Sequence, residues 1–115
     1  LDPDEVIVNV EFPIPDKSGY AKFPNPASRY AIVGVFVSTL SSNARVSITG
    51  AASCVFRQLE YENVLSRAFL KPDLAHIKIS SDELNTDLHA SAEYRAHLIH
   101  IMTCRAVASA NGDTI

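Results

Sequence analysis

The sequence predicts an α+β domain, in which an antiparallel sheet of three to four strands is followed by about three helices packed on one face. Three observations indicate this fold class. Apolar residues alternate with other residues in the first half of the chain, and from Arg57 onward they recur every three to four positions. Pro and Gly separate the candidate strands. The longest helical pattern, residues 87–110, contains neither Gly nor Pro.

The strands come first in the chain. Residues 5–12 alternate Val and Phe with other residues and predict a half-buried strand that Pro13 ends. Residues 20–23 predict a short second strand, and residues 29–40, nearly continuous in β-branched and aromatic residues, predict a central one. Residues 44–52 predict the return strand of a hairpin.

The connections have their own signals. Residues 16–19 predict a turn, and the Pro-rich residues 23–28 predict a loop. Residues 41–43, Ser-Ser-Asn, predict the hairpin turn. Gly34, inside the central strand, indicates either a bulge or a close approach of another group to the backbone.

The second half predicts helices at residues 59–68 and 72–79, a polar connection at residues 80–86, and then the long helix. Ser91 is the expected N-cap, Glu93 suits the helix dipole, and residues 111–112, Asn-Gly, form the stop signal. One face is expected to pack in the core, with Tyr94 anchoring its first turn; its members are Tyr94, Leu98, Ile101, Met102 and Arg105, widened by Ile99, Ala106 and Val107.

Composition, net charge and the length of apolar runs argue against several classes of function. The 115 residues are 47% hydrophobic with a net charge of −3, which suits one domain and argues against a nucleic-acid or polybasic membrane surface. No apolar run reaches the length of a membrane span and no signal peptide is recognisable, so a cytoplasmic protein is expected. Two cysteines without a secretory signal favour buried thiols over a disulfide.

Three groups of side chains are candidates for a metal, nucleophile or acid-base site. His97, His100 and Cys104 share a helical stripe but lack a fourth ligand, so no metal site is predicted. Cys54 and Cys104 are interpreted as buried thiols rather than nucleophiles. The charged residues around the start of the long helix predict ion pairs, with Arg95 placed to pair with Asp87 or Glu60 and Arg105 in the same cluster. No catalytic residue is predicted.

Four segments resemble one known family. They are the entry at residues 1–15, the passage at 20–37 with Tyr20-x-Lys22 and PASRYA, the Gly-Ala-Ala-Ser turn at 44–57, and the SAEYR block within residues 87–107. Together they resemble the C-terminal domain of the FAD-binding medium subunit of molybdenum hydroxylases, the carbon monoxide dehydrogenase and xanthine dehydrogenase family. The resemblance covers nearly the whole chain, so residues 1–115 are expected to form this domain, with residues 1–12 ending the connection from a missing FAD-binding part.

The resemblance implies a function. The domain would be a structural and interface part of a molybdenum-dependent oxidoreductase subunit, helping to enclose FAD and packing against the FAD-binding domains, an iron-sulfur small subunit and a molybdopterin large subunit. Tyr20 and Lys22 would lie near the flavin, with the ring over the isoalloxazine and the ammonium offsetting charge on the reduced ring.

The chain by itself is expected neither to bind FAD nor to be catalytic, because it has no Gly-rich phosphate loop. The alternative is an independent α+β protein-interaction module with no catalytic activity. From the residues alone, Tyr20 and Lys22 are ordinary exposed strand residues.

Overall fold

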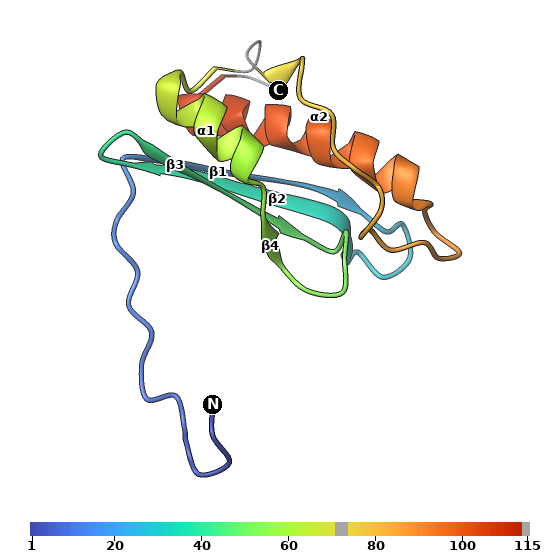
Figure 1. The fold of residues 1–115 in the computed structure, drawn as a ribbon, viewed down its shortest axis with the longest axis horizontal. Coiled ribbons are helices and arrows are strands. Elements are labelled where there is room, and N and C mark those ends of the chain that lie inside the picture. Colours follow the sequence, from blue (N-terminus) through green and yellow to red (C-terminus); the bar gives the residue numbers. More distant parts are fainter. Residues whose placement is uncertain (71–73, 114–115) are drawn as a thin grey trace.

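A computed structural model describes residues 1–70 and 74–113 of the chain. Four strands form one antiparallel sheet in sequence order, followed by two helices (Figure 1). The elements are β1 (Lys17–Pro24), β2 (Ala31–Leu40), β3 (Asn43–Thr49), β4 (Phe56–Arg57), α1 (Leu59–Arg67) and α2 (Ala92–Asn111). The predicted α+β class is confirmed, with two helices where about three were expected.

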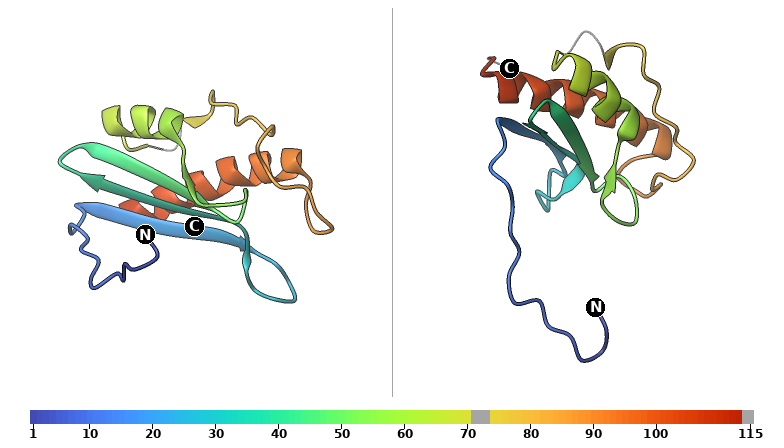
Figure 2. Two further views of the ribbon diagram at one scale, coloured as in Figure 1. Left: turned by 60° about the horizontal axis from the view of Figure 1, so that its bottom comes forward. Right: turned by 60° about the vertical axis from the view of Figure 1, so that its left-hand side comes forward.

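Both helices cover the same face of the sheet, and this two-layer arrangement is visible in Figure 1 and in the right-hand view of Figure 2. The core lies between the layers. The alternate residues Val33, Val35 and Val37 of β2 point into it and are fully buried, together with Ile48 of β3 and Ile99 of α2. Neither helix of the described chain combines the length and apolar character that a membrane crossing needs.

The predicted helix at residues 72–79 is the missing one. Its described part, residues 74–79, forms a turn and an extended connection, while Pro72 lies outside the described residues. Leu74 is nevertheless fully buried, and Ile77 and Ile79 pack against the core. The apolar spacing therefore identifies residues whose side chains pack in the core, although their backbone is irregular. A segment this short is a weak helix former by itself.

Two glycines lie where other groups approach closely, Gly19 against α2 and Gly34 on the sheet face away from the helices. Gly19 lies inside β1 rather than in the expected turn. A Cβ at this position would overlap the carbonyl oxygen of Ala106, so the glycine allows β1 to approach α2 closely. Gly34 is not a bulge, since the β1–β2 register runs on through it and shifts only between Phe23 and Pro24. Close approach, the other expectation for Gly34, is what the structure shows.

The predicted hairpin turn is confirmed. Leu40 pairs with Asn43, and the two residues between them, Ser41 and Ser42, have φ of 49° and 67°. Positive φ at both central positions is the geometry of a two-residue turn that matches the twist of the strands. The N–H of Ser41 also donates to the carboxylate of Asp16 at 2.8 Å, which fixes the start of β1 beside this turn.

Helix α2 is capped as expected. The hydroxyl of Ser91 accepts from the N–H of Tyr94 at 3.2 Å, and Gly112 closes the helix with φ of 77°. The buried face differs from the prediction in two places. At the start of the helix Arg95 is buried while Tyr94 is 43% exposed, and in its second half Arg105 is exposed. Tyr94 meets Phe23 edge-on at 6.2 Å between ring centroids and does not anchor the core.

Helix α1 covers the part of β3 that the two-residue β4 leaves unpaired. The N–H of Ala44 donates to the hydroxyl of Ser66 at 2.8 Å, and the N–H of Val46 donates to the carboxylate of Glu62 at 3.0 Å. Two backbone donors that an edge strand would leave open are therefore satisfied by side chains of the helix. This places α1 firmly at the β3 side of the sheet.

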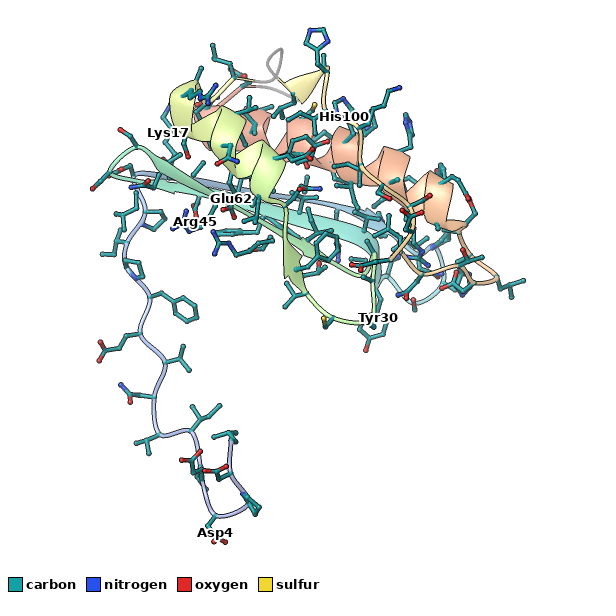
Figure 3. All side chains as sticks on the ribbon, in the orientation of Figure 1. Asp4, Lys17, Tyr30, Arg45, Glu62 and His100 are labelled. Carbon is teal, nitrogen blue, oxygen red and sulfur yellow. The ribbon has the colours of Figure 1, made fainter. Side chains whose placement is uncertain are left out.

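The strand predicted at residues 5–12 is wrong for this structure. Residues 5–15 form no strand and extend away from the domain, with Asp4 far from the sheet (Figure 3). Nothing in the described chain lies beside them as a neighbouring strand, and a strand needs one to satisfy its N–H and C=O groups. Their apolar side chains are exposed: Val6, Val8, Val10, Phe12 and Ile14.

Candidate functional site

The candidate site is the sheet face that the helices do not cover, called here the open sheet face. Its members are Tyr20 and Lys22 of β1, Gly34, Phe36 and Ser38 of β2, Arg45, Ser47 and Thr49 of β3, and Arg57 of β4. Successive side chains of a strand point to opposite faces of the sheet, so these residues share one face while the residues between them face the helices. Tyr20, Phe36, Ser47 and Arg57 lie opposite one another in a single row across the sheet.

Tyr20 lies midway along β1, the edge strand of the sheet. It is 50% exposed and pairs with Phe36, which is 43% exposed, so two aromatic rings stand on adjacent strands. A Cβ at Gly34 would lie 2.8 Å from the Tyr20 hydroxyl and 2.6 Å from Oγ1 of Thr49. The side chain of Tyr20 therefore reaches across Gly34, and a side chain there would force it away.

Lys22 is on the same face, as the alternation predicts, opposite Gly34. Its Nζ donates to the carbonyl oxygen of Arg29 at 3.2 Å. Arg29 has φ of 64° in the loop between β1 and β2. The ammonium is thus held at the margin of the face by a backbone carbonyl, with no carboxylate in contact with it among the described residues.

The other end of the face is also cationic, and there the charge is partly paired. Arg57 donates to Glu62 through Nε at 2.9 Å and through Nη2 at 2.5 Å, while Nη1 of Arg45 lies 3.8 Å from the same carboxylate. Burial by itself raises the pKa of Glu62, but hydrogen bonds from Arg57 and from the Val46 N–H, with the charges of both arginines, hold this pKa below its ordinary value. Glu62 therefore stays ionised and positions the arginine side chains.

A hollow of about 530 Å³ adjoins this end of the face. Phe12, Pro13 and Pro15 line it from the extended N-terminal segment, and Phe36, Leu40 and Arg45 are among the residues that line it from the sheet. The lining is mainly apolar, so the hollow suits packing of another apolar surface.

The face is suited to binding rather than to a reaction. It offers two half-exposed aromatic rings between cationic groups, a combination that packs well against a flat ring system or an anionic partner. Among the described residues, no three His, Cys, Asp or Glu side chains are grouped as metal ligands would be. Tyr20 and Lys22, the residues selected from the sequence, both lie on this face. Phe36 was not selected, although its position between the buried Val35 and Val37 places its side chain on the outward side of β2.

The His and Cys residues of α2 lie elsewhere, among the helices. His100 lies between the hydroxyl of Tyr61, 3.1 Å from Nδ1, and Sγ of Cys104, 3.8 Å from Nε2, while His97 is exposed. Burial, with the neighbouring Cys104 and Glu60, raises the pKa of Tyr61. Cys54 is exposed rather than buried, so that part of the thiol interpretation is wrong, and Cys104 is half-buried.

Arg95 is a buried charged residue of α2 that contacts β2, the residue after β3 and the loop before α2. Its Nη1 donates to the carbonyl oxygens of Ile32 at 2.6 Å and Gly50 at 3.0 Å, and its Nη2 pairs with Asp87 at 2.7 Å. The N–H groups of His89 and Ala90, together with Arg95, hold the pKa of Asp87 below its usual range. The predicted Asp87 pair is thus confirmed, and Glu60 is not involved.

Two curated proteins from Paenarthrobacter nicotinovorans match the chain. The nicotine 6-hydroxylase medium subunit is 30% identical over 124 aligned positions, which cover 99% of this chain and 44% of that subunit. The 6-hydroxypseudooxynicotine dehydrogenase complex subunit alpha is 34% identical over 121 positions, which cover 94% of this chain and 41% of that subunit. The chain is therefore a homologue of part of these two subunits.

This relationship confirms the family resemblance in the sequence. The chain spans less than half the length of the medium subunits it matches. No protein-family model matches it, and no solved structure does. The two relatives belong by name to a nicotine 6-hydroxylase and a 6-hydroxypseudooxynicotine dehydrogenase complex, and neither name is that of a carbon monoxide or xanthine dehydrogenase.

Proposed function

We propose that this chain is the C-terminal domain of a medium subunit in a molybdenum hydroxylase complex, and that its open sheet face packs over the flavin held by the rest of that subunit. The carrying observation is that one sheet face is left uncovered and bears Tyr20 beside Phe36 with Lys22 at its margin. The helices already shield the other face of the sheet, which favours the open sheet face as the surface that meets the flavin-binding part.

The chemistry of the face suits this role. An exposed aromatic ring provides a flat apolar surface against which an isoalloxazine ring can lie. The Lys22 ammonium, held only by the Arg29 carbonyl in the described structure, would oppose the negative charge that develops on a reduced flavin. Tyr20 and Lys22 are therefore proposed as flavin-contacting residues that adjust its environment without taking part in bond-making.

The partners follow from the same proposal. The FAD-binding domains of the same subunit would contact the open sheet face, and an iron-sulfur small subunit and a molybdopterin large subunit would complete an oxidoreductase of the cytoplasm. The homologous subunits come from complexes with several subunits, which favours this arrangement over an independent interaction module.

The test replaces Tyr20 by Ala and, separately, Lys22 by Met in the full-length subunit. We expect Tyr20→Ala to shift the flavin absorbance and Lys22→Met to lower the flavin reduction potential, because each removes a group placed beside the ring. Tyr94→Ala and Lys78→Met, on the helix side of the molecule, are the matched controls. Wild-type absorbance, potential and acceptor turnover in both site variants would mean that the flavin lies elsewhere.

A further inference from the structure

Residues 6–14 form a long apolar segment whose side chains do not pack in the core of the domain. Val6, Val8, Val10, Phe12 and Ile14 are between 63% and 92% exposed. In an extended chain, residues two apart point to one side, so these five side chains form a continuous stripe. The other side carries Ile7 and the polar Asn9 and Glu11.

The backbone groups of this segment, the N–H and C=O groups of residues 6–15, also have no hydrogen-bond partners in the described chain. Asp16 is where attachment begins, because its N–H donates to the carbonyl oxygen of Thr39 at 2.7 Å and its carboxylate accepts from Ser41. The segment therefore projects from a fixed point, and at roughly 3.3 Å per residue it reaches about 30 Å.

The direction of projection indicates what it meets. Figure 1 and the right-hand view of Figure 2 show the segment on the side of the sheet away from both helices, which is the side of the open sheet face. The hollow between Phe12 and Phe36 joins the segment to that face. A single body packed on the open sheet face would therefore also lie beside the segment.

We infer that residues 6–12 form an added β-strand on the edge of a sheet in the remaining part of the medium subunit. The inference rests on the proposed function for the identity of this partner. The alignment with the nicotine 6-hydroxylase medium subunit covers 99% of this chain but only 44% of that protein. The segment thus has a counterpart in a polypeptide that contains ample further chain to provide the sheet.

The partner surface follows from the two sides of the strand. An edge strand supplies the backbone hydrogen bonds, and an apolar layer beneath it receives the Val and Phe stripe. The acidic residues Asp2, Asp4, Glu5 and Glu11 favour a partner with Lys or Arg beside that edge. Pro13 and Pro15 end the pairing before β1 begins, so the segment links the two sheets without merging them.

Backbone amide exchange tests the inference on two samples, the 115-residue chain and the full-length subunit. Amides in residues 6–12 should exchange rapidly in the chain and at least about tenfold more slowly in the subunit. Val8→Lys, on the stripe, should abolish that slowing, whereas Asn9→Lys, which adds the same charge to the opposite side, should retain it. Both positions are outside the folded domain, so circular dichroism of the chain should be unchanged.

Three results would overturn the inference. Exchange as fast in the subunit as in the chain would show that no strand forms. Slow exchange in the isolated chain would show that the segment folds onto its own sheet, or onto a second copy if the slowing depends on concentration. Equal effects of the two lysine variants would show that the stripe is not buried.

Flavin absorbance of the same samples reports separately on the proposed function. A subunit with bound flavin and rapid exchange would contradict only the added strand. Slow exchange combined with no response of the flavin to Tyr20→Ala and Lys22→Met would contradict only the flavin contact.

Discussion

At the scale of single residues, Arg95 shows how one buried charge organises three segments. Its guanidinium joins α2 to the carbonyl oxygen of Ile32 in β2, to that of Gly50 after β3, and to Asp87 before the helix. The side chain is 3% exposed, and its Nε has no partner in the described residues. A charge at such a site is retained because its partners are fixed carbonyl and carboxylate oxygens.

Replacing Arg95 by Ala should therefore destabilise the domain strongly. Two carbonyl groups would lose their donor in a largely buried place, and the expected loss of unfolding free energy is about 3 kcal/mol. Arg105→Ala, at an exposed position of the same helix, should change it by no more than about 0.5 kcal/mol. Urea denaturation measures both, and similar values for the two variants would contradict the assigned role of Arg95.

The buried face of α2 could be predicted only in part from spacing. Leu98, Met102 and Ala106 are buried as expected, because three-and-four spacing fixes the middle of the stripe. At its start the apolar character of Tyr94 suggested burial, whereas the structure buries the neighbouring Arg95. Spacing carries no information about loop carbonyls far away in sequence, and those carbonyls decide which of the two residues faces inward.

At the scale of elements, α1 and β3 are joined through side chains that satisfy backbone groups. Glu62 is central, since it accepts from the Val46 N–H and from Arg57 while only 5% exposed. Neither contact is visible in the sequence, because β4 is only two residues long and its length determines which N–H groups of β3 remain open. β1, β2, β3 and α1 were predictable from local periodicity, whereas β4 was not.

The lowered pKa of Glu62 predicts an acid dependence of stability. A carboxyl with a pKa lower in the folded state than its ordinary value of about 4.3 stabilises the fold above that value. The stabilisation is lost as the pH falls through the folded pKa. Asp87, whose pKa is also lowered, adds to the same loss.

Denaturation curves at several pH values should show this for Glu62→Gln. The variant should be less stable than the wild type near neutral pH, and the difference should shrink between about pH 5 and pH 3. Glu60→Gln, an exposed carboxylate in the same turn of α1, provides the control and should show little difference throughout. A difference for Glu62→Gln that stays constant with pH would mean that its charge is not what matters.

For the extended N-terminal segment, residues 5–12, the alternation of apolar residues predicted a strand that the structure does not contain. Periodicity reports which side chains would share a face, but a strand also needs a neighbour for its backbone groups. The alternation is explained if the neighbour is in another part of the subunit, and this explanation is the basis of the added-strand inference.

At the scale of the whole molecule, one face of the sheet is covered by two helices (Figure 2). The other face carries aromatic and cationic side chains. Fold class and family were accessible from the sequence, because strand alternation, helix caps and family motifs are local signals. The composition of the open sheet face was accessible only in part. It depends on the register that aligns Tyr20, Phe36, Ser47 and Arg57, which only the folded sheet reveals.

Hydroxyl-radical footprinting of the 115-residue chain and of the full-length subunit tests the central claim most directly. Tyr20 and Phe36 are half-exposed in the chain and should lose most of their reactivity in the subunit, because the open sheet face becomes covered. Tyr94, similarly exposed on the helix side, should keep its reactivity. Unchanged oxidation of Tyr20 and Phe36 together with protection of Tyr94 would contradict the account, since the subunit would then pack against the helices.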